Sequence, residues 1–320
     1  MSKATFAVIA AASAATGAGV TALFCSSKSS QQQKQAQPPP VPVPASAPTP
    51  YAPPRTALQS PVNPSGILQY GFPGPVSDSL SSLPFTGAFD RRTRNPAWVA
   101  EHITPQSLMQ RNGDRKNSSF YEDVAIPPAF RAKLSDYFRS GYDRGHQVPA
   151  SDAKWSQDAM DETFSLSNMC PQVGEGFNRD YWAHFEDFCR RLTTKYPSVR
   201  IVTGPLYLPH RDPDGKWRVS YEVVGNPPNV AVPTHFYKII YGEDGTANPR
   251  SNVALGAFVL PNTRIPNEKS LGDFEVPLEA VERASGLEFA SKLEASRRKR
   301  LCQEVKCEVI VREFNNARKN

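Results

Sequence analysis

The chain has 320 residues, and 39% of them are hydrophobic, which is ample for one large folded domain or two small ones. It carries 37 basic and 31 acidic residues, and the resulting charge of +6 favours anionic partners such as nucleic acid or an anionic membrane, unless surface composition alone explains the excess. The five cysteines form no CxxC pair, which argues against a zinc site. Cys302 and Cys307 could form a bridge, but we prefer free, buried thiols throughout.

An uncharged stretch at residues 4–24 is the first feature of the chain. It is just long enough to span a bilayer as a helix, and Lys3 and Lys28 flank it. Three interpretations compete: a membrane anchor combined with a mitochondrial address, a cleaved secretory signal, and a transit peptide. Because the stretch lacks arginine and a good small-residue cleavage site, we favour an anchor that is uncleaved or only partly processed.

The segment at residues 31–65 is rich in glutamine and proline. Proline removes backbone donors and fixes φ, so the segment can build neither a helix nor a strand ladder and is expected to be an extended linker. We therefore divide the chain into an apolar targeting segment at 1–30, this linker, a folded domain at 66–290 and a basic C-terminal extension at 291–320.

Apolar spacing and turn residues predict the elements of the folded domain. Residues 87–103 have the pattern of a hairpin, and residues 127–138 have the proline start and the spacing of a helix. A short helix is also expected at 277–286. Further strands are predicted at 199–206, 217–224, 232–241, 253–260 and 307–312. Because strands and helices mix without regular alternation, we expect an α+β fold with a mainly antiparallel sheet flanked by helices.

Chemically reactive side chains concentrate in residues 142–192, which begin with the tetrapeptide DRGH at 143–146. Its place between Gly141 and Pro149 indicates a strand end or a turn, where a histidine can face solvent. An imidazole with an ordinary pKa suits the role of general base for water, although a single histidine is more often a cap or a core residue. The neighbours of His146 change this balance.

An amphipathic helix is predicted after Asn178. Its apolar positions recur at steps of four, three and four: Tyr181, Phe185, Phe188 and Leu192. Glu186 and Arg190 share a different face. Taken alone, Asn178 would be a helix cap, and Glu186 and Arg190 would be an i,i+4 ion pair.

Together, these residues resemble the DNA/RNA non-specific endonuclease family, whose members have a ββα-metal site. The resemblance covers roughly residues 66–290. It rests on an ordered series of motifs: DRGH at 143–146, Ser167, Asn168, Pro171 and Gln172, then Asn178 and Trp182, Glu186 and Arg190, and the segments at 203–206, 232–236 and 282–287. One departure is Arg179, where family members usually have glutamine, and this change leaves Asn178 intact.

The resemblance implies a nuclease that hydrolyses phosphodiester bonds of DNA and RNA and leaves 5′-phosphate and 3′-hydroxyl ends. It makes His146 the general base. Asn178 would bind a hydrated Mg²⁺, with Mn²⁺ as the other candidate ion, through its carboxamide oxygen. Glu186 would hold one of the waters bound to the metal.

Five further residues receive supporting roles from the same resemblance. Arg190 matches a phosphate-stabilising arginine, and Arg115 aligns less closely with a second one. Asp143 and Asn168 are expected to shape the site through hydrogen bonds. Arg144 either does the same or touches the substrate.

Partners and location follow from the same comparison. Phosphate contacts position a nucleic acid without reading its bases, so we expect activity on both DNA and RNA with strong salt dependence. The family also implies a homodimer and a mitochondrial location, at the inner membrane and facing the intermembrane space. Residues 4–24 would then anchor the nuclease in the membrane.

Two alternatives come from other functional classes. A catalytically inactive descendant that binds nucleic acid or a partner protein has no chemical need for all four of the residues assigned to catalysis and metal binding. A serine or cysteine hydrolase that uses His146 would need a nucleophile elbow, which the chain lacks, and Cys170 and Cys189 lie in apolar surroundings.

Overall fold

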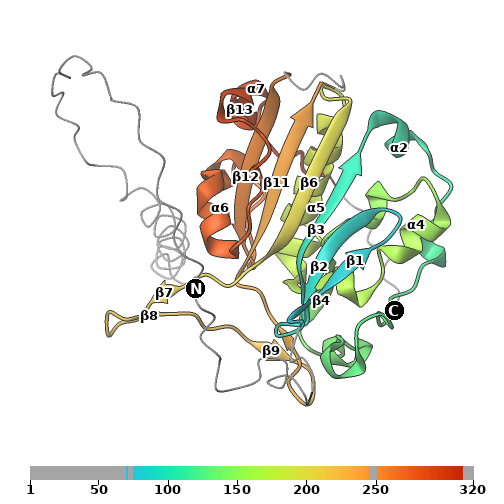
Figure 1. Ribbon diagram of the computed structural model, residues 1–320, viewed down its shortest axis with the longest axis vertical. Helices are drawn as coiled ribbons and strands as arrows, with labels where there is room; N and C mark the ends of the chain where they lie inside the picture. The colour runs from blue at the N-terminus through green and yellow to red at the C-terminus, as the bar shows by residue number, and fades with distance from the viewer. Residues whose placement is uncertain (1–69, 71–74, 245–250, 313–320) are drawn as a thin grey trace, which may run out of the picture. The chain divides into compact units, whose positions relative to one another are not determined.

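The largest element of the fold is a mixed β-sheet, seen nearly face-on in Figure 1. The computed structural model describes residues 70, 75–244 and 251–312, so the predicted anchor and the predicted linker lie outside the described residues. The strands follow in the order β1-β2-β3-β6-β11-β12-β13, and every neighbouring pair is antiparallel except β12 with β13. Their bounds are β1 Ser77–Ser81, β2 Phe85–Asp90, β3 Asn95–Ile103, β6 Ser198–Leu206, β11 His235–Glu243, β12 Val253–Pro261 and β13 Arg298–Arg300.

The described helices are short apart from one. Their bounds are α2 Pro105–Met109, α3 Leu134–Tyr137, α4 Gln157–Glu162, α5 Tyr181–Leu192, α6 Leu278–Ser285 and α7 Leu301–Glu304. Single 3₁₀ turns lie at Arg115–Asn117, Pro128–Phe130, Ala150–Asp152, Leu166–Asn168, Leu271–Phe274 and Ala295–Arg297. Within the described part of the chain, every helix is too short or too polar to cross a bilayer. The fold is therefore α+β with a mainly antiparallel sheet, as the sequence predicted.

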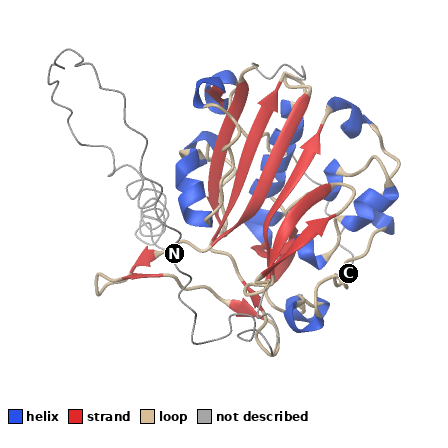
Figure 2. Ribbon diagram, in the orientation of Figure 1, coloured by secondary structure: helices blue, strands red, loops and turns tan. Residues whose placement is uncertain are grey.

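Helix α5 covers one face of the sheet, behind the central strands in Figure 2. Its apolar stripe is the predicted one, and Phe185 and Phe188 are almost fully buried. Phe185 packs edge-on against Phe258 of β12 at a centroid distance of 5.3 Å. Because a buried phenylalanine contributes roughly 3–5 kcal/mol relative to alanine, this stripe fixes the position of α5 on the sheet.

The other face of the sheet is covered near β12 by α6 and the segment that follows it (Figure 1). Tyr237 points to this face and contacts the ring of Phe289 at 5.4 Å. The helix ends where the sequence predicted, because Gly286 adopts φ of 74°, a left-handed conformation that glycine accepts without strain. The predicted hairpin at 87–103 is also confirmed, as β2 and β3.

A second, two-stranded sheet pairs β4 (Tyr142–His146) with β5 (Met169–Val173). A tight turn at Gly174–Asn178 then leads directly into α5, so two strands and a helix form one continuous unit. Gly145 is required here, because a Cβ atom at this position would lie 1.9 Å from the Gln172 side chain on the paired strand. The glycine of DRGH and the glutamine of the second motif are therefore parts of one contact.

Two predicted elements are interrupted in the structure. The prediction of one helix at 127–138 is wrong, because the chain forms only the turn Pro128–Phe130 and the four-residue α3 there. Asp136 of α3 accepts a hydrogen bond through its carboxylate from the Lys133 backbone N–H at 2.7 Å, which caps a new helical start in place of a continued helix.

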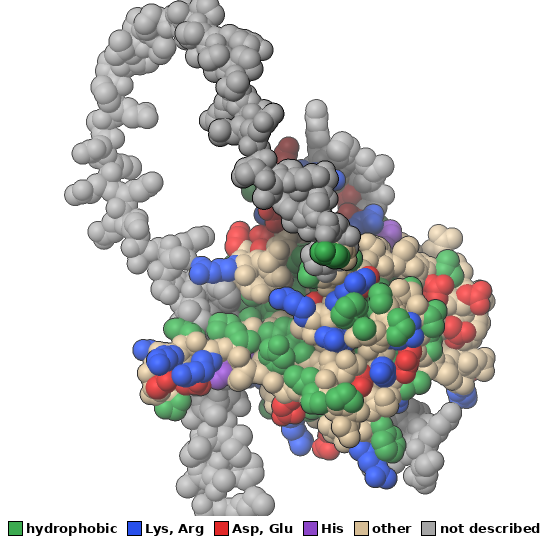
Figure 3. Space-filling model, turned by 60° about the horizontal axis from the view of Figure 1, so that its bottom comes forward, with side chains coloured by type: hydrophobic (Ala, Val, Ile, Leu, Met, Phe, Trp, Pro, Cys, Tyr) green, Lys and Arg blue, Asp and Glu red, His purple; other side chains and the backbone are tan. Residues whose placement is uncertain are grey.

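The strand expected at 217–224 is split as well. Trp217–Arg218 forms β8, paired with β7 (His210–Arg211), while Val223–Val224 forms β9, paired with β10 (Val230–Ala231). The run stands away from the main sheet, and Trp217 is 52% exposed. Figure 3 shows basic and acidic side chains together on the projecting β7–β8 hairpin, and Arg218 pairs there with Asp214.

The C-terminal region differs from both predictions made for it. Residues 307–312 form no strand, and Cys302 and Cys307 form a disulfide, so the prediction of free thiols was wrong for this pair. The backbone of this region binds side chains of α5 instead of a strand partner: Arg191 donates to the Glu308 carbonyl at 3.0 Å. Cys170 and Cys189 are free and buried, as expected.

Candidate active site

His146 is the last residue of β4, and its ring is buried rather than aimed at solvent as the sequence suggested. The ring lies edge-on to Phe164 at 4.8 Å and tilted against Phe120 at 5.6 Å. Its Nε2 atom has no hydrogen-bond partner among the described residues. Burial and the nearby Arg115 cation lower the pKa of His146 to about 3, so the imidazole is neutral at physiological pH.

Asn168 fixes the chain beside this histidine. Its Oδ1 accepts from the Val148 backbone N–H at 3.0 Å, and its Nδ2 donates to the carbonyls of Val148 and Thr163 at 3.0 and 2.8 Å. Its own carbonyl accepts from the Gln147 N–H at 2.9 Å. The carboxamide is thus occupied by backbone, and Asn168 holds the turn that follows His146 rather than facing a substrate.

Asn178 and Asp143 are directly connected. Asn178 closes the turn before α5, and its Nδ2 donates to Asp143 Oδ2 at 2.8 Å. Arg179 donates from Nε to the same oxygen at 2.7 Å, so Arg179 also holds Asp143 in place. The first bond holds the amide nitrogen of Asn178 against Asp143, and no described protein group donates to the Asn178 Oδ1 atom.

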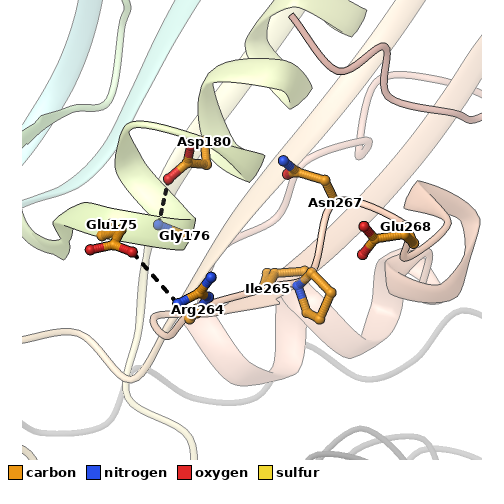
Figure 4. Close-up of a pocket in the computed structure, with 8 residues that line it drawn as sticks. Glu175, Gly176, Asp180, Arg264, Ile265, Asn267 and Glu268 are labelled. Carbon is orange, nitrogen blue, oxygen red and sulfur yellow. Dashed lines mark hydrogen bonds and ion pairs between the residues drawn. The ribbon is translucent and has the colours of Figure 1, made fainter. Parts of the chain in front are cut away.

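The tight turn before Asn178 explains another glycine. Gly176 has φ of 79°, and a Cβ atom there would lie 2.3 Å from the Arg264 side chain. Together with the Asp180 carboxylate, which accepts from the Gly176 N–H, this packing forms a hollow of about 350 Å³ (Figure 4). None of the site residues expected from the sequence lines this hollow, so it is separate from the candidate active site.

Glu186 and Arg190 lie one turn apart on α5. The Arg190 Nη1 atom donates to Asp152 Oδ1 at 2.9 Å, so its ion-pair partner in the structure is Asp152 rather than Glu186. Burial opposes the charge of Arg190, but Asp152 and Glu186 outweigh this effect and raise its pKa. Burial raises the pKa of Glu186 to about 7, although Lys238 and Arg190 oppose the rise.

Two buried ionisable residues beneath α5 were missed from the sequence. Glu101 of β3 is 6% exposed, and burial together with the charge of Asp152 raises its pKa well above the ordinary range. Lys238 of β11 is almost fully buried, donates to Thr203 Oγ1 at 2.8 Å and lies 4.8 Å from the Trp182 ring. A lysine inside the apolar run FYKIIY was the available signal for one of them.

Arg115 belongs to the same cluster although it is distant in sequence. Its guanidinium lies 5.2 Å from the centroid of Phe164, the ring that also packs against His146. Burial lowers the pKa of Arg115, and the charge of Glu186 opposes this effect. The structure thus brings Arg115 close to both His146 and the polar face of α5.

Arg144 points to a different place. Its guanidinium lies 4.3 Å from the centroid of Phe120, whose ring also packs against His146. There Arg144 lines an open hollow of about 620 Å³ on the surface. The His146 and Arg144 side chains of the DRGH tetrapeptide therefore occupy neighbouring but distinct positions, and Phe120 lies between them.

The comparisons with known proteins identify the family of this chain. The family model for DNA/RNA non-specific endonuclease matches residues 63–296. The chain belongs to the DNA/RNA non-specific endonuclease family. This endonuclease is 62% identical to the mitochondrial nuclease of Saccharomyces cerevisiae over 84% of each chain. It is 43% identical to mitochondrial endonuclease G of Caenorhabditis elegans over 71% of this chain and 72% of that protein.

A solved structure supports the assignment at the level of the fold. A chain of the EndoG/EndoGI complex superposes with a TM-score of 0.67 at 44% identity, covering 74% of this chain and 97% of its own. The endonuclease therefore has the ββα-metal fold, with β4, β5 and α5 as its two strands and helix. It is a hydrolase that acts on nucleic acid, and its family is metal-dependent.

No group of three or more histidine, cysteine, aspartate or glutamate side chains in the described part of the chain could hold a metal ion. The donor set that the sequence predicts is instead the single carboxamide oxygen of Asn178, with Glu186 acting through a water. Such a set fits a hard ion that keeps most of its waters, such as Mg²⁺, better than a soft ion that demands sulfur or imidazole.

Proposed function

We propose that this endonuclease is a Mg²⁺-dependent enzyme that cleaves both DNA and RNA and leaves 5′-phosphate and 3′-hydroxyl ends. One observation carries the proposal. A neutral histidine with an unpartnered Nε2 atom and an asparagine whose amide nitrogen is fixed by Asp143 belong to one continuous β4–β5–α5 unit.

Asn178 would hold the metal through Oδ1, because its Nδ2 is already committed to Asp143. When bound, Mg²⁺ or Mn²⁺ supplies electrostatic stabilisation for charge on the phosphate and the leaving 3′ oxygen. Glu186 would orient a water in this region through its carboxylate, which requires its ionised form.

His146 would accept the proton of the attacking water at Nε2. Attack on phosphorus breaks the bond to the 3′ oxygen, so the phosphate stays on the 5′ side of the downstream fragment. Arg190, held by Asp152, and Arg115, stacked on Phe164, would stabilise the negative charge that accumulates on the phosphate oxygens. These groups contact phosphate and water, which explains cleavage without base readout.

A plasmid-nicking assay in Mg²⁺ tests the proposal. Wild type should nick duplex DNA and degrade single-stranded RNA, and His146→Ala should lose both activities while keeping its circular dichroism spectrum. Asn178→Ala should lose the response to added Mg²⁺. Wild-type rates in His146→Ala, or activity on only one of the two nucleic acids, would overturn the corresponding part of the proposal.

We infer further that the endonuclease is mitochondrial, because relatives that it resembles are named as mitochondrial nucleases. We propose that residues 4–24 anchor it at the inner membrane facing the intermembrane space and that it forms a homodimer. Protease protection of fractionated mitochondria tests the location, and a soluble matrix protein would contradict it. Light scattering of the purified chain tests the dimer, and a monomeric mass would contradict it.

A further inference from the structure

The open hollow beside the DRGH segment has a composition that the catalytic roles above leave unexplained. It lies next to the site, because Phe120 contacts the His146 ring on one side and the Arg144 guanidinium on the other. Its volume is about 620 Å³, and carboxylates are absent from its lining. The lining residues are Ser118, Ser119, Phe120, Leu134, Ser135, Phe138 and Arg144.

Phe138 is the most unusual residue of this hollow. Its side chain is 72% exposed, although an exposed aromatic ring forfeits the stabilisation of burial. The next residue, Arg139, has φ of 54°, which is uncommon for a residue with a side chain, and its guanidinium lies 5.0 Å from the Phe138 ring. The backbone is therefore bent immediately after Phe138, and the ring remains in solvent with a cation beside it.

The hollow thus combines an exposed aromatic ring with the Arg144 guanidinium and serine hydroxyls, and the Arg139 guanidinium lies beside the Phe138 ring. Nucleic acids present flat rings and phosphates at alternating positions, and proteins bind single strands by stacking bases on aromatic side chains and pairing the backbone with cations. A paired base inside a duplex has both faces covered by its neighbours, so an exposed ring of this kind suits an unpaired base.

We propose that this hollow is a subsite for an unpaired nucleobase next to the scissile phosphate. Phe138 stacks on the base, and Arg144 binds the adjacent phosphate. The proposal rests on the proposed nuclease function and adds a substrate class to it: single-stranded or locally unstacked nucleic acid is cut in preference to a regular duplex. The hydroxyls and cations tolerate any base, so the subsite creates no sequence specificity.

The subsite is tested by measuring whether the effect of removing a base on the cleavage rate depends on Phe138. Each substrate is an end-labelled single-stranded DNA with one nucleotide replaced by an abasic analogue, and a sequencing gel gives the cleavage rate at each bond. In wild type, the bond beside the abasic position should be cut about tenfold more slowly, which is the size expected for loss of one base–aromatic stack.

The variants separate stacking from a general loss of activity. Phe138→Ala should cut the intact strand about tenfold more slowly and show no further loss at the abasic position. Phe138→Trp should restore both the rate and the abasic effect. Trp217→Ala, which removes an exposed ring on the β7–β8 hairpin, should behave like wild type.

The outcomes also distinguish failure of the subsite from failure of the nuclease function. Wild type that cuts no strand in Mg²⁺ would overturn the proposed function itself. Wild type that cuts all strands equally well, or Phe138→Ala that retains the full abasic effect, would overturn the subsite alone.

Discussion

The carboxylate of Glu186 should make the protein less stable while it makes the enzyme active. Burial raises its pKa from the ordinary 4.5 to about 7, so the folded state binds this proton more tightly than the unfolded state does. Its contribution to stability therefore falls as pH rises from about 4.5 to about 7, and the cost is fully present above that range. Replacing Glu186 with glutamine removes the ionised form and with it this cost.

The expected size of this stability cost follows from the shift in the pKa of Glu186. A change of one pKa unit corresponds to about 1.4 kcal/mol, which sets an upper limit of about 3 kcal/mol for the move from 4.5 to about 7. Because water still reaches part of this half-buried side chain, we expect the stabilisation of Glu186→Gln to be about 2 kcal/mol larger near pH 8 than near pH 5.

Urea unfolding of the metal-free protein at the two pH values measures this difference. Glu186→Gln should gain stability mainly at the higher pH and lose nuclease activity at both. Glu279→Gln, at an exposed position on α6, is the matched control and should leave the pH dependence unchanged. The same change in unfolding free energy at both pH values would refute the assignment of a buried, costly carboxylate.

Three further predictions concern the surroundings of the site. The kcat/KM of wild type should rise with pH through a single ionisation near 7, the value for Glu186, and a limb near 3 would instead point to His146 alone. Asp152→Asn should lower the unfolding free energy by roughly 3 kcal/mol and reduce activity, because it leaves Arg190 buried without its partner; an unchanged urea midpoint would contradict the buried pair. The double replacement of Cys302 and Cys307 by serine should lower the unfolding free energy by about 2 kcal/mol, because the bridge closes only a short loop, and a urea titration measures this loss. A nicking assay should show an unchanged kcat. Loss of kcat would mean that the C-terminal region acts on the site.

The sequence predicted best what depends on local spacing. The steps between Tyr181, Phe185 and Phe188 identify α5 and its buried face, because a helix repeats its contacts every three to four residues. The hairpin at 87–103 and the end of α6 at Gly286 also follow from short-range turn chemistry. Trp217–Val224 shows the limit of this reasoning, since an apolar run forms a continuous strand only where a neighbouring strand is available.

The surroundings of the site depend on contacts between distant segments. The burial of His146 results from Phe120 and Phe164, and no local pattern around DRGH predicts which rings will cover it. Glu101 and Lys238 lie on the face beneath α5 because of the registers of β3 with β6 and of β6 with β11. A single sequence contains no direct record of these registers, so the nearness of Lys238, which opposes the rise in the pKa of Glu186, could not be assigned in advance.

The continuity of β4, β5 and α5 has a consequence for which contacts of the site are local in the chain. The pairing of β4 with β5 closes the loop at residues 147–168, and Asn178, which follows β5, then reaches Asp143 of β4. Lys238, which opposes the rise in the pKa of Glu186, belongs to β11 and arrives only through long-range strand pairing. The contacts between β4, β5 and the turn before α5 therefore involve one stretch of the chain, whereas the pKa of Glu186 also depends on a strand that is distant in sequence.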